Sequence, residues 1–226
     1  MRTPQHEAPW AVVPVKALDD AKQRLADVLP PEARRRLMLV MLHDVLATLR
    51  QVARLGPVLV VTPDMHVAEL AQRSGARVLR EACGQGHSVA VAAGFAHARA
   101  HGAVQALTLP GDAPCVTCGE IEDLIDAGDR IAAPGVVMVP ARDGDGTNAL
   151  LVAPPGAFPP RFGPGSFARH RAEAEARRLD CRVLPLAGIG LDIDEPRDLQ
   201  ALLALKRNDP RYAFLQDAAS AEEIRP

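Results

Sequence analysis

The chain has 226 residues, of which 48% are hydrophobic and 24% charged, and its formal net charge is -2. This mixture is typical of a globular protein and excludes disorder, collagen and a coiled coil as descriptions of the whole chain. A net charge so close to zero argues against a nucleic-acid partner. We also expect no membrane partner, because no apolar run reaches the roughly 18 residues that a membrane span needs. The N-terminus lacks the apolar core of a signal peptide, so we expect a cytoplasmic protein.

Short β-rich runs alternate with helical segments along the chain. In chain order, the pattern predicts strand 10–15, helix 31–50, strand 57–62, helix 66–73, strand 77–79, helix 88–100, strand 104–109, helix 117–127, strands 136–139 and 149–152, helix 166–178, strand 181–186 and helix 196–206. Such alternation predicts an α/β fold with three layers, in which helices cover both faces of a mostly parallel, mixed sheet. We expect a single domain over residues 1–226, with its core at about 10–206 and a polar tail after it.

Lysines follow the first predicted strand. The chain contains only three lysines, and two of them, Lys16 and Lys22, lie in the segment P-V-K-A-L-D-D-A-K-Q-R-L at residues 14–25. Ligands of parallel sheets bind beyond the carboxyl ends of the strands, and an ammonium group suits phosphate as a point charge. The segment therefore predicts a clamp on a polyphosphate. The alternative is a solvated loop before a helix.

Acidic side chains follow two other strands. Asp112 lies in L-P-G-D-A-P, and Asp192 and Asp194 alternate with apolar residues in G-L-D-I-D-E-P. In an extended segment such alternation places both carboxylates on one side, where their repulsion is costly unless a cation lies between them. Oxygen ligands of this kind suit Mg²⁺. The pattern predicts a magnesium site of two or three carboxylates, although Asp112 alone could be a turn former.

Two glycine-rich loops each precede a predicted helix. The first, G-Q-G-H-S at residues 84–88, could bind an anion at the helix N-terminus and let a planar base approach the backbone. The second, F-G-P-G-S-F at residues 162–167, offers backbone N–H groups and Ser166, which we predict to be the helix N-cap. Thr147, in the preceding D-G-D-G-T-N-A-L, could add a hydroxyl donor to this seat for a small phosphate or carboxylate. A plain hairpin is the alternative for that segment.

Several other site classes lack their motifs. The sequence contains no G-x-G-x-x-G, no Walker motif and no G-x-S-x-G, which excludes those dinucleotide, P-loop and serine hydrolase sites. His87 and His170 each lie beside a glycine-rich loop, and their roles are left open.

Taken together, five segments resemble one known family. They are P-V-K-x-L-x-x-A-K-x-R-L, L-P-G-D-A-P, D-G-T-N-A-L, G-P-G-S-F-x-x-H and L-D-I-D-E-P-x-D-L. In this order and spacing they resemble the 2-phospholactate guanylyltransferase family of coenzyme F420 biosynthesis, over residues 10–206. The specific part is D-G-T-N-A-L followed by G-P-G-S-F. The other motifs are shared with nucleotidyltransferases of the glycosyltransferase-A-like, nucleotide-diphospho-sugar transferase-like α/β fold.

The resemblance implies an enzyme that joins GMP from GTP to a three-carbon phospho-acid and releases pyrophosphate. The acid would be 3-phosphoglycerate, phosphoenolpyruvate or 2-phospho-L-lactate, and Mg²⁺ would be the cofactor. Carried onto this chain, it assigns the acid to Thr147, Gly163 and Ser166, the magnesium to Asp112, Asp192 and Asp194, the triphosphate to Lys16 and Lys22, and the nucleotide also to Gly84, Gly86 and Ser88. Lys16, Lys22 and Asp112 would be the catalytic residues.

One departure from the family leaves alternatives open. The family usually has G-L-N where this chain has Gly86-His87-Ser88, and the missing Asn would help to place guanine. Selectivity for the base is therefore open. Another nucleotidyltransferase, of the sugar-nucleotide or molybdopterin type, would share the lysines and carboxylates but use a different acceptor. A non-catalytic nucleotide-binding module is the third reading. The oligomeric state does not follow from these residues, and a homodimer stays open.

Overall fold

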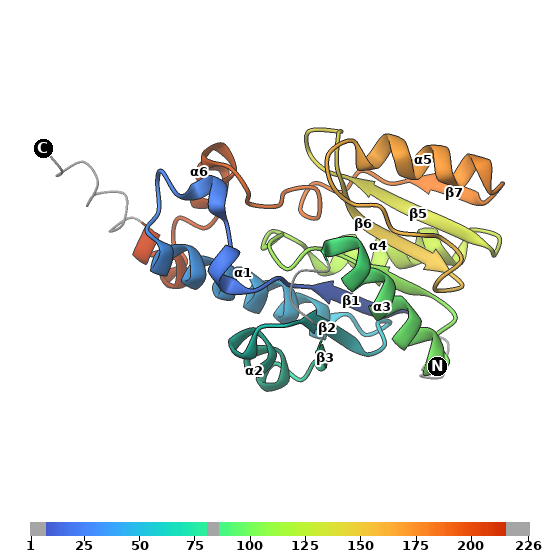
Figure 1. Ribbon diagram of the computed structural model, residues 1–226, viewed down its shortest axis with the longest axis horizontal. Helices are drawn as coiled ribbons and strands as arrows, with labels where there is room; N and C mark the ends of the chain where they lie inside the picture. Colours follow the sequence, from blue (N-terminus) through green and yellow to red (C-terminus); the bar gives the residue numbers. More distant parts are fainter. Residues whose placement is uncertain (1–7, 81–85, 216–226) are drawn as a thin grey trace, which may run out of the picture.

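The structure is a computed structural model that describes residues 8–80 and 86–215 (Figure 1). Its sheet consists of β1 (Trp10–Pro14), β2 (Val58–Thr62), β3 (Arg77–Arg80), β4 (Ala106–Thr108), β5 (Gly135–Pro140), β6 (Thr147–Ala153) and β7 (Asp180–Val183). The strand order is β3-β2-β1-β4-β6-β5-β7. All neighbours pair in parallel except β6, which is antiparallel to both β4 and β5. The predicted α/β fold with a mostly parallel, mixed sheet is confirmed.

Helices cover both faces of this sheet. They are α1 (Pro31–Gln51), α2 (Met65–Arg73), α3 (His87–Ala100), α4 (Cys118–Asp129), α5 (Ser166–Ala176) and α6 (Pro196–Leu205). Apolar residues of α1, α2, α4 and α6 form one core cluster, and those of α3 and α5 form another on the opposite face. Along β1, Ala11 and Val13 belong to the first cluster and Trp10 and Val12 to the second, as the two-residue period of a strand requires. The three predicted layers are therefore present.

Local sequence signals explain where several helices begin. Thr117 caps α4 in the predicted capping box with Glu120, and Pro196 occupies the first turn of α6. Predicted and observed bounds differ by a few residues at most. The pattern did not reveal three short 3-10 helices, at Leu18–Asp20, Gln23–Leu25 and Pro210–Tyr212. None of the helices within residues 8–80 and 86–215 combines the length and apolarity that crossing a membrane requires.

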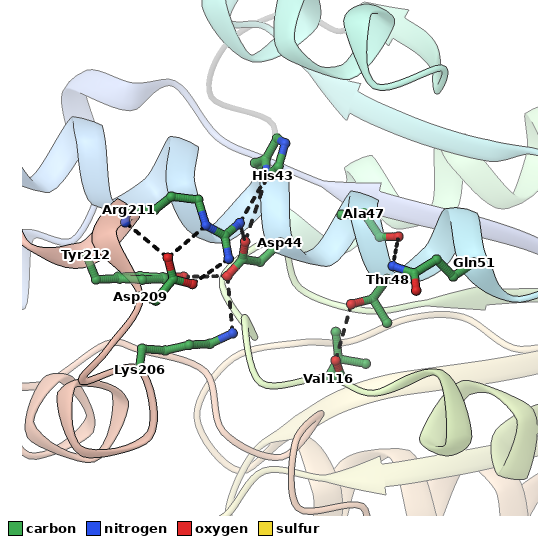
Figure 2. A network of polar contacts seen from close by, with 10 residues as sticks. All are labelled: His43, Asp44, Ala47, Thr48, Gln51, Val116, Lys206, Asp209, Arg211 and Tyr212. Carbon is green, nitrogen blue, oxygen red and sulfur yellow. Dashed lines mark hydrogen bonds and ion pairs between the residues drawn. The ribbon is translucent and has the colours of Figure 1, made fainter.

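The C-terminal segment packs against α1, although the sequence indicated a core ending at residue 206 and a polar tail. Tyr212 and Leu215 are buried in the core. Figure 2 shows the polar side of this contact, where the buried Asp44 of α1 accepts a hydrogen bond from the Tyr212 hydroxyl at 2.9 Å. Lys206 lies 3.3 Å from the same carboxylate, and Arg211 pairs with its other oxygen. Tyr212 and Leu215 form no periodic pattern with their neighbours in the sequence. Their packing could therefore not be predicted from the sequence.

Replacing Tyr212 by Phe should test how much this contact contributes. The variant keeps the buried ring and removes only the hydroxyl that Asp44 accepts. A hydrogen bond to a charged group contributes about 1.5–3 kcal/mol, and Lys206 and Arg211 still neutralise Asp44, so we expect a loss of about 1.5 kcal/mol. Denaturant unfolding measures it. A midpoint equal to that of the wild type would show that the hydroxyl contributes nothing to the packing of this segment.

Candidate active site

A cleft of about 820 Å³ lies at the edge of the sheet where β1 and β4 end. Because β6 runs antiparallel to β4, its first residues lie at that edge too. Eight of the predicted site residues line this cleft: Lys16, Lys22, Asp112, Thr147, Gly163, Ser166, Asp192 and Asp194. Of the remaining three, Gly86 and Ser88 do not belong to the lining found in the described part of the chain, and Gly84 lies outside the described residues.

The carboxylates come together from two distant segments. Asp112 follows β4, and its backbone carbonyl accepts a hydrogen bond from the Ile193 N–H at 3.1 Å. This bond fastens the extended segment 190–195 beside the end of β4. Within that segment Leu191 and Ile193 are buried while Asp192 and Asp194 are partly exposed, as the alternation predicted.

Lys22 lies between two of these carboxylates. Its ammonium donates to Asp112 and to Asp194 Oδ1, the latter at 2.8 Å, and its side chain is only 3% exposed. The backbone of Lys22 is left-handed, with φ of 53°, which is uncommon for a residue with a Cβ and carries strain. The sequence predicted a lysine that contacts phosphate, and the structure shows Lys22 as the counter-ion of Asp112 and Asp194.

The electrostatics of the cluster favour a further cation. Burial lowers the pKa of Lys22, but Asp112 and Asp194 outweigh it and hold the pKa above its ordinary value. Burial raises the pKa of Asp194, but the Lys22 ammonium outweighs it and holds that pKa below its ordinary value. Asp192 has no such partner, and burial together with the neighbouring Asp112 carboxylate raises its pKa to about 6. The Asn148 amide donates to Asp192 Oδ1 at 3.0 Å and supplies only partial compensation.

The donor set fits Mg²⁺ held together with a nucleotide. Across residues 8–80 and 86–215, no group of three or more His, Cys, Asp or Glu side chains forms a ready metal site. Mg²⁺ is usually held by one or two carboxylates together with substrate phosphates and water, so it needs no such cage. All the donors here are oxygens, and Asp192 carries charge that Lys22 does not pair. The geometry therefore favours the version of the predicted site that uses two carboxylates.

Hydroxyl groups from the first residues of β6 and α5 also line the cleft. The Thr147 N–H donates to Ser166 Oγ at 2.9 Å, and Thr147 Oγ1 lies 2.9 Å from His170 Nδ1. The turn before α5 requires glycine at Gly163 and Gly165, whose φ angles are 116° and 66°.

The prediction that Ser166 is the N-cap of α5 was wrong. Gly165 occupies that position, and Ser166 is the first helical residue. The hydroxyl of Ser166 accepts a hydrogen bond from β6 instead of from its own helix. A serine beside a left-handed glycine resembles a cap in the sequence, and only the position of β6 distinguishes the two cases.

The segment predicted to bind the nucleotide reaches the cleft through His87. The Ser88 hydroxyl accepts the Phe162 N–H at 2.9 Å, which ties the start of α3 to the glycine-rich loop. His87 packs edge-on against the Phe162 ring, with centroids 4.6 Å apart, and lines the cleft. Burial lowers the pKa of His87 to about 4, with Asp112 opposing the shift and Lys16 adding to it. The imidazole of His87 is therefore uncharged at neutral pH.

Comparison with known proteins now identifies the family. The model of the family described as "Guanylyl transferase CofC like" matches residues 10–220. The chain belongs to the CofC-like guanylyltransferases. The phosphoenolpyruvate guanylyltransferase of Sphaerobacter thermophilus is 41% identical over 192 residues, which cover 85% of this chain and 91% of that protein. The enzyme of the same name from Rubrobacter xylanophilus is 42% identical over 195 residues, which cover 86% and 93%.

A solved structure supports the fold of this CofC-like protein. A nucleotide-diphospho-sugar transferase from Desulfovibrio desulfuricans G20 superimposes with a TM-score of 0.75, covering 95% of this chain and 96% of that one at 16% sequence identity. The resemblance seen in the sequence is thus confirmed, and the CofC-like chain is a nucleotidyltransferase enzyme. Among the residues of the cleft and its support, Asn148, His87 and His170 had no role assigned from the sequence, although all three lie inside the quoted segments.

Proposed function

We propose that this CofC-like guanylyltransferase acts as a single domain that joins GMP from GTP to a three-carbon phospho-acid in coenzyme F420 biosynthesis. The observation that carries the proposal is that one cleft combines two kinds of binding group. Lysines and carboxylates suited to a magnesium triphosphate follow β1 and β4 and precede α6, and paired hydroxyls suited to a small anion come from the first residues of β6 and α5. Phosphoenolpyruvate is the acid that we expect first, because the relatives at 41% and 42% identity carry its name.

The reaction needs little acid–base chemistry from the protein. An oxygen of the acid's phosphate attacks the α-phosphorus of GTP, and the bond between the α-phosphorus and the bridging oxygen breaks. The products are the guanosine-diphosphate-linked acid and pyrophosphate, which keeps the bonding electron pair. Because the attacking phosphate is already anionic at neutral pH, no general base is required. The barrier lies in bringing two anions together in line, so positioning and charge neutralisation supply the catalysis.

Particular residues match these tasks. Lys16 is exposed in the cleft and would bind the triphosphate, while Lys22 lies beside Asp112, where the α-phosphate would approach. Asp112 and Asp192 would hold Mg²⁺, with Asp194 keeping Lys22 in place. When bound, Mg²⁺ neutralises charge on the α-phosphate and the departing pyrophosphate. Thr147, Gly163 and Ser166 would orient the acid.

The test is a pyrophosphate-release assay in which one phospho-acid is supplied at a time. Phosphoenolpyruvate, 3-phosphoglycerate and 2-phospho-L-lactate would each be combined with Mg²⁺ and GTP, and with ATP or CTP as controls. We expect release with GTP and one acid. Release only with ATP or CTP would refute guanylyl transfer and point to His87 and Ser88. No release with any combination would refute the proposal.

Replacing Ser166 by Ala should weaken binding of the acid. Ser166 is 1% exposed and lines the cleft, and its hydroxyl is bonded to Thr147 rather than to either lysine. A lost hydrogen bond to a charged ligand corresponds to roughly a tenfold rise in the KM of the acid. We expect the KM of GTP to stay within about twofold. Steady-state kinetics with each substrate varied in turn measures both constants, and an equal rise in the two would place Ser166 elsewhere in the reaction.

A further inference from the structure

His170 is a buried histidine that contacts Thr147, one of the two hydroxyl residues that line the cleft. It projects from α5 one turn after Ser166 and has no exposed surface. The rings of Phe158 and Phe162 enclose it, with centroids 5.4 and 5.3 Å from its own. Both ring nitrogens are hydrogen bonded, Nε2 to the Arg161 backbone N–H at 2.8 Å and Nδ1 to Thr147 Oγ1 at 2.9 Å.

These two contacts determine the tautomer of His170. A backbone N–H can only donate, so Nε2 facing Arg161 must be the unprotonated acceptor. In the neutral ring the proton then resides on Nδ1, which donates it to Thr147 Oγ1. Burial, together with Arg169 and Arg161 and against Glu173, lowers the pKa of His170 to about 4, so the ring is neutral at neutral pH.

The tautomer in turn sets the polarity of Thr147. Once Oγ1 accepts the hydrogen bond from His170 Nδ1–H, the hydroxyl hydrogen of Thr147 must point elsewhere, and Thr147 lines the cleft. Across the described part of the chain, this hydroxyl makes no other hydrogen bond. Ser166 Oγ is set in the same way, because it accepts the Thr147 N–H at 2.9 Å. Each hydroxyl therefore has an internal donor and a free hydrogen.

We propose that His170 is a positioning residue that makes Thr147 a hydrogen-bond donor to the phospho-acid. The inference rests on the proposed function and refines its acid site. With His170, Arg161 and Ser166 arranged in this way, the site offers donors to its ligand. It favours groups that only accept hydrogen bonds, such as phosphate and carboxylate oxygens, and disfavours ligands that present an N–H or O–H at that point.

Variants of His170 with matched kinetics test the inference. His170→Phe keeps an aromatic ring in the pocket but cannot donate, so the KM of the acid should rise about tenfold or more. The KM of GTP and kcat should stay within about twofold, because among the described residues His170 bonds only to Arg161 and Thr147 and not to the lysines or carboxylates. His170→Gln should recover most of the loss. Its amide oxygen can accept the Arg161 N–H while its NH₂ donates to Thr147, at a spacing close to that of the ring nitrogens.

A Thr147→Val background distinguishes an effect of His170 through the Thr147 hydroxyl from an effect of His170 on packing. If His170 acts through the Thr147 hydroxyl, His170→Phe should raise the KM of the acid no further once that hydroxyl is gone. A full additional tenfold rise in this background would overturn the inference. So would equal changes in the two KM values, or a His170→Gln variant as impaired as His170→Phe. Thermal unfolding of each variant shows whether a change reflects lost structure.

A measurement on the wild type separates this inference from the proposed function. Nitrogen-15 NMR of the histidine rings reports which ring nitrogen carries the proton, and it needs no substrate. We expect the Nδ1–H tautomer at His170, and an Nε2–H tautomer would overturn the inference whatever the enzyme's acid proves to be. Conversely, the enzyme could show an Nδ1–H tautomer and release no pyrophosphate with any acid. That result would support the hydrogen bond from His170 to Thr147 and refute the proposed reaction.

Discussion

Replacing Asp112 by Asn is expected to lower kcat by at least about 100-fold. The substitution keeps the size of the side chain and one acceptor oxygen but removes the charge that Lys22 pairs and that a magnesium ion would need. The KM of the acid should change little, because Thr147 and Ser166, which we propose to bind the acid, are held by each other and by His170 and not by Asp112. Pyrophosphate release under saturating substrates measures the loss.

The control for Asp112 is another carboxylate that pairs with a cation far from the cleft. Asp126 on α4 is exposed and pairs with Arg54, and it is not among the residues that line the cleft. Asp126→Asn should retain turnover within about twofold of the wild type. Turnover of Asp112→Asn within about threefold of the wild type would refute the assignment of Asp112 to the catalytic machinery.

Replacing Lys22 by Met should reduce both stability and turnover. The ammonium is buried between Asp112 and Asp194, and its removal leaves two carboxylates without their counter-ion. Breaking a fully buried pair costs about 3–5 kcal/mol, but Asp194 is 49% exposed, so we expect about 2 kcal/mol. For a chain of this size that corresponds to a fall of roughly 5 °C in Tm. Turnover should fall by about 100-fold, because in the proposed reaction the same ammonium would neutralise charge on the α-phosphate.

Lys16 provides the matched control. It lines the same cleft but is exposed, and it forms no ion pair with any residue of the described part of the chain. Lys16→Met should therefore raise the KM of GTP while leaving the free energy of unfolding within about 0.5 kcal/mol of the wild type. If Lys22→Met unfolds at the same denaturant concentration as the wild type, Lys22 is not the counter-ion that the geometry indicates.

Much of the fold could be predicted because its signals are local. Apolar runs such as residues 57–62 and the capping box at Thr117 depend on a few neighbouring residues, and the structure contains the corresponding elements. The order of the strands depends on which surfaces pack across the sheet. Nothing near residues 147–153 indicates that β6 lies between β4 and β5. The burial of Tyr212 was hidden for the same reason, because its partner Asp44 is 168 residues away.

The candidate site likewise has parts that could be predicted from short motifs and parts that could not. Asp112, Asp192 and Asp194 could be singled out from short motifs, and the structure brings them to one cleft. The pairing of Lys22 with Asp112 and Asp194 could not be predicted. It depends on the left-handed backbone of Lys22 between two 3-10 helices, which have no periodic sequence pattern. The hydrogen bond from His170 to Thr147 was hidden as well. It requires the register of α5 against β6, which no spacing along the chain records.

The reversed direction of β6 has a consequence for how enzymes of this kind could diversify. Because β6 begins at the cleft, the residues proposed to bind the acid all come from one continuous stretch, from the end of β5 through the first turns of α5. The lysines and carboxylates come instead from three separate stretches, after β1, after β4 and before α6. If the proposed assignment holds, exchange of a single stretch of the gene could introduce a different acceptor acid and leave the residues proposed for nucleotidyl transfer unchanged.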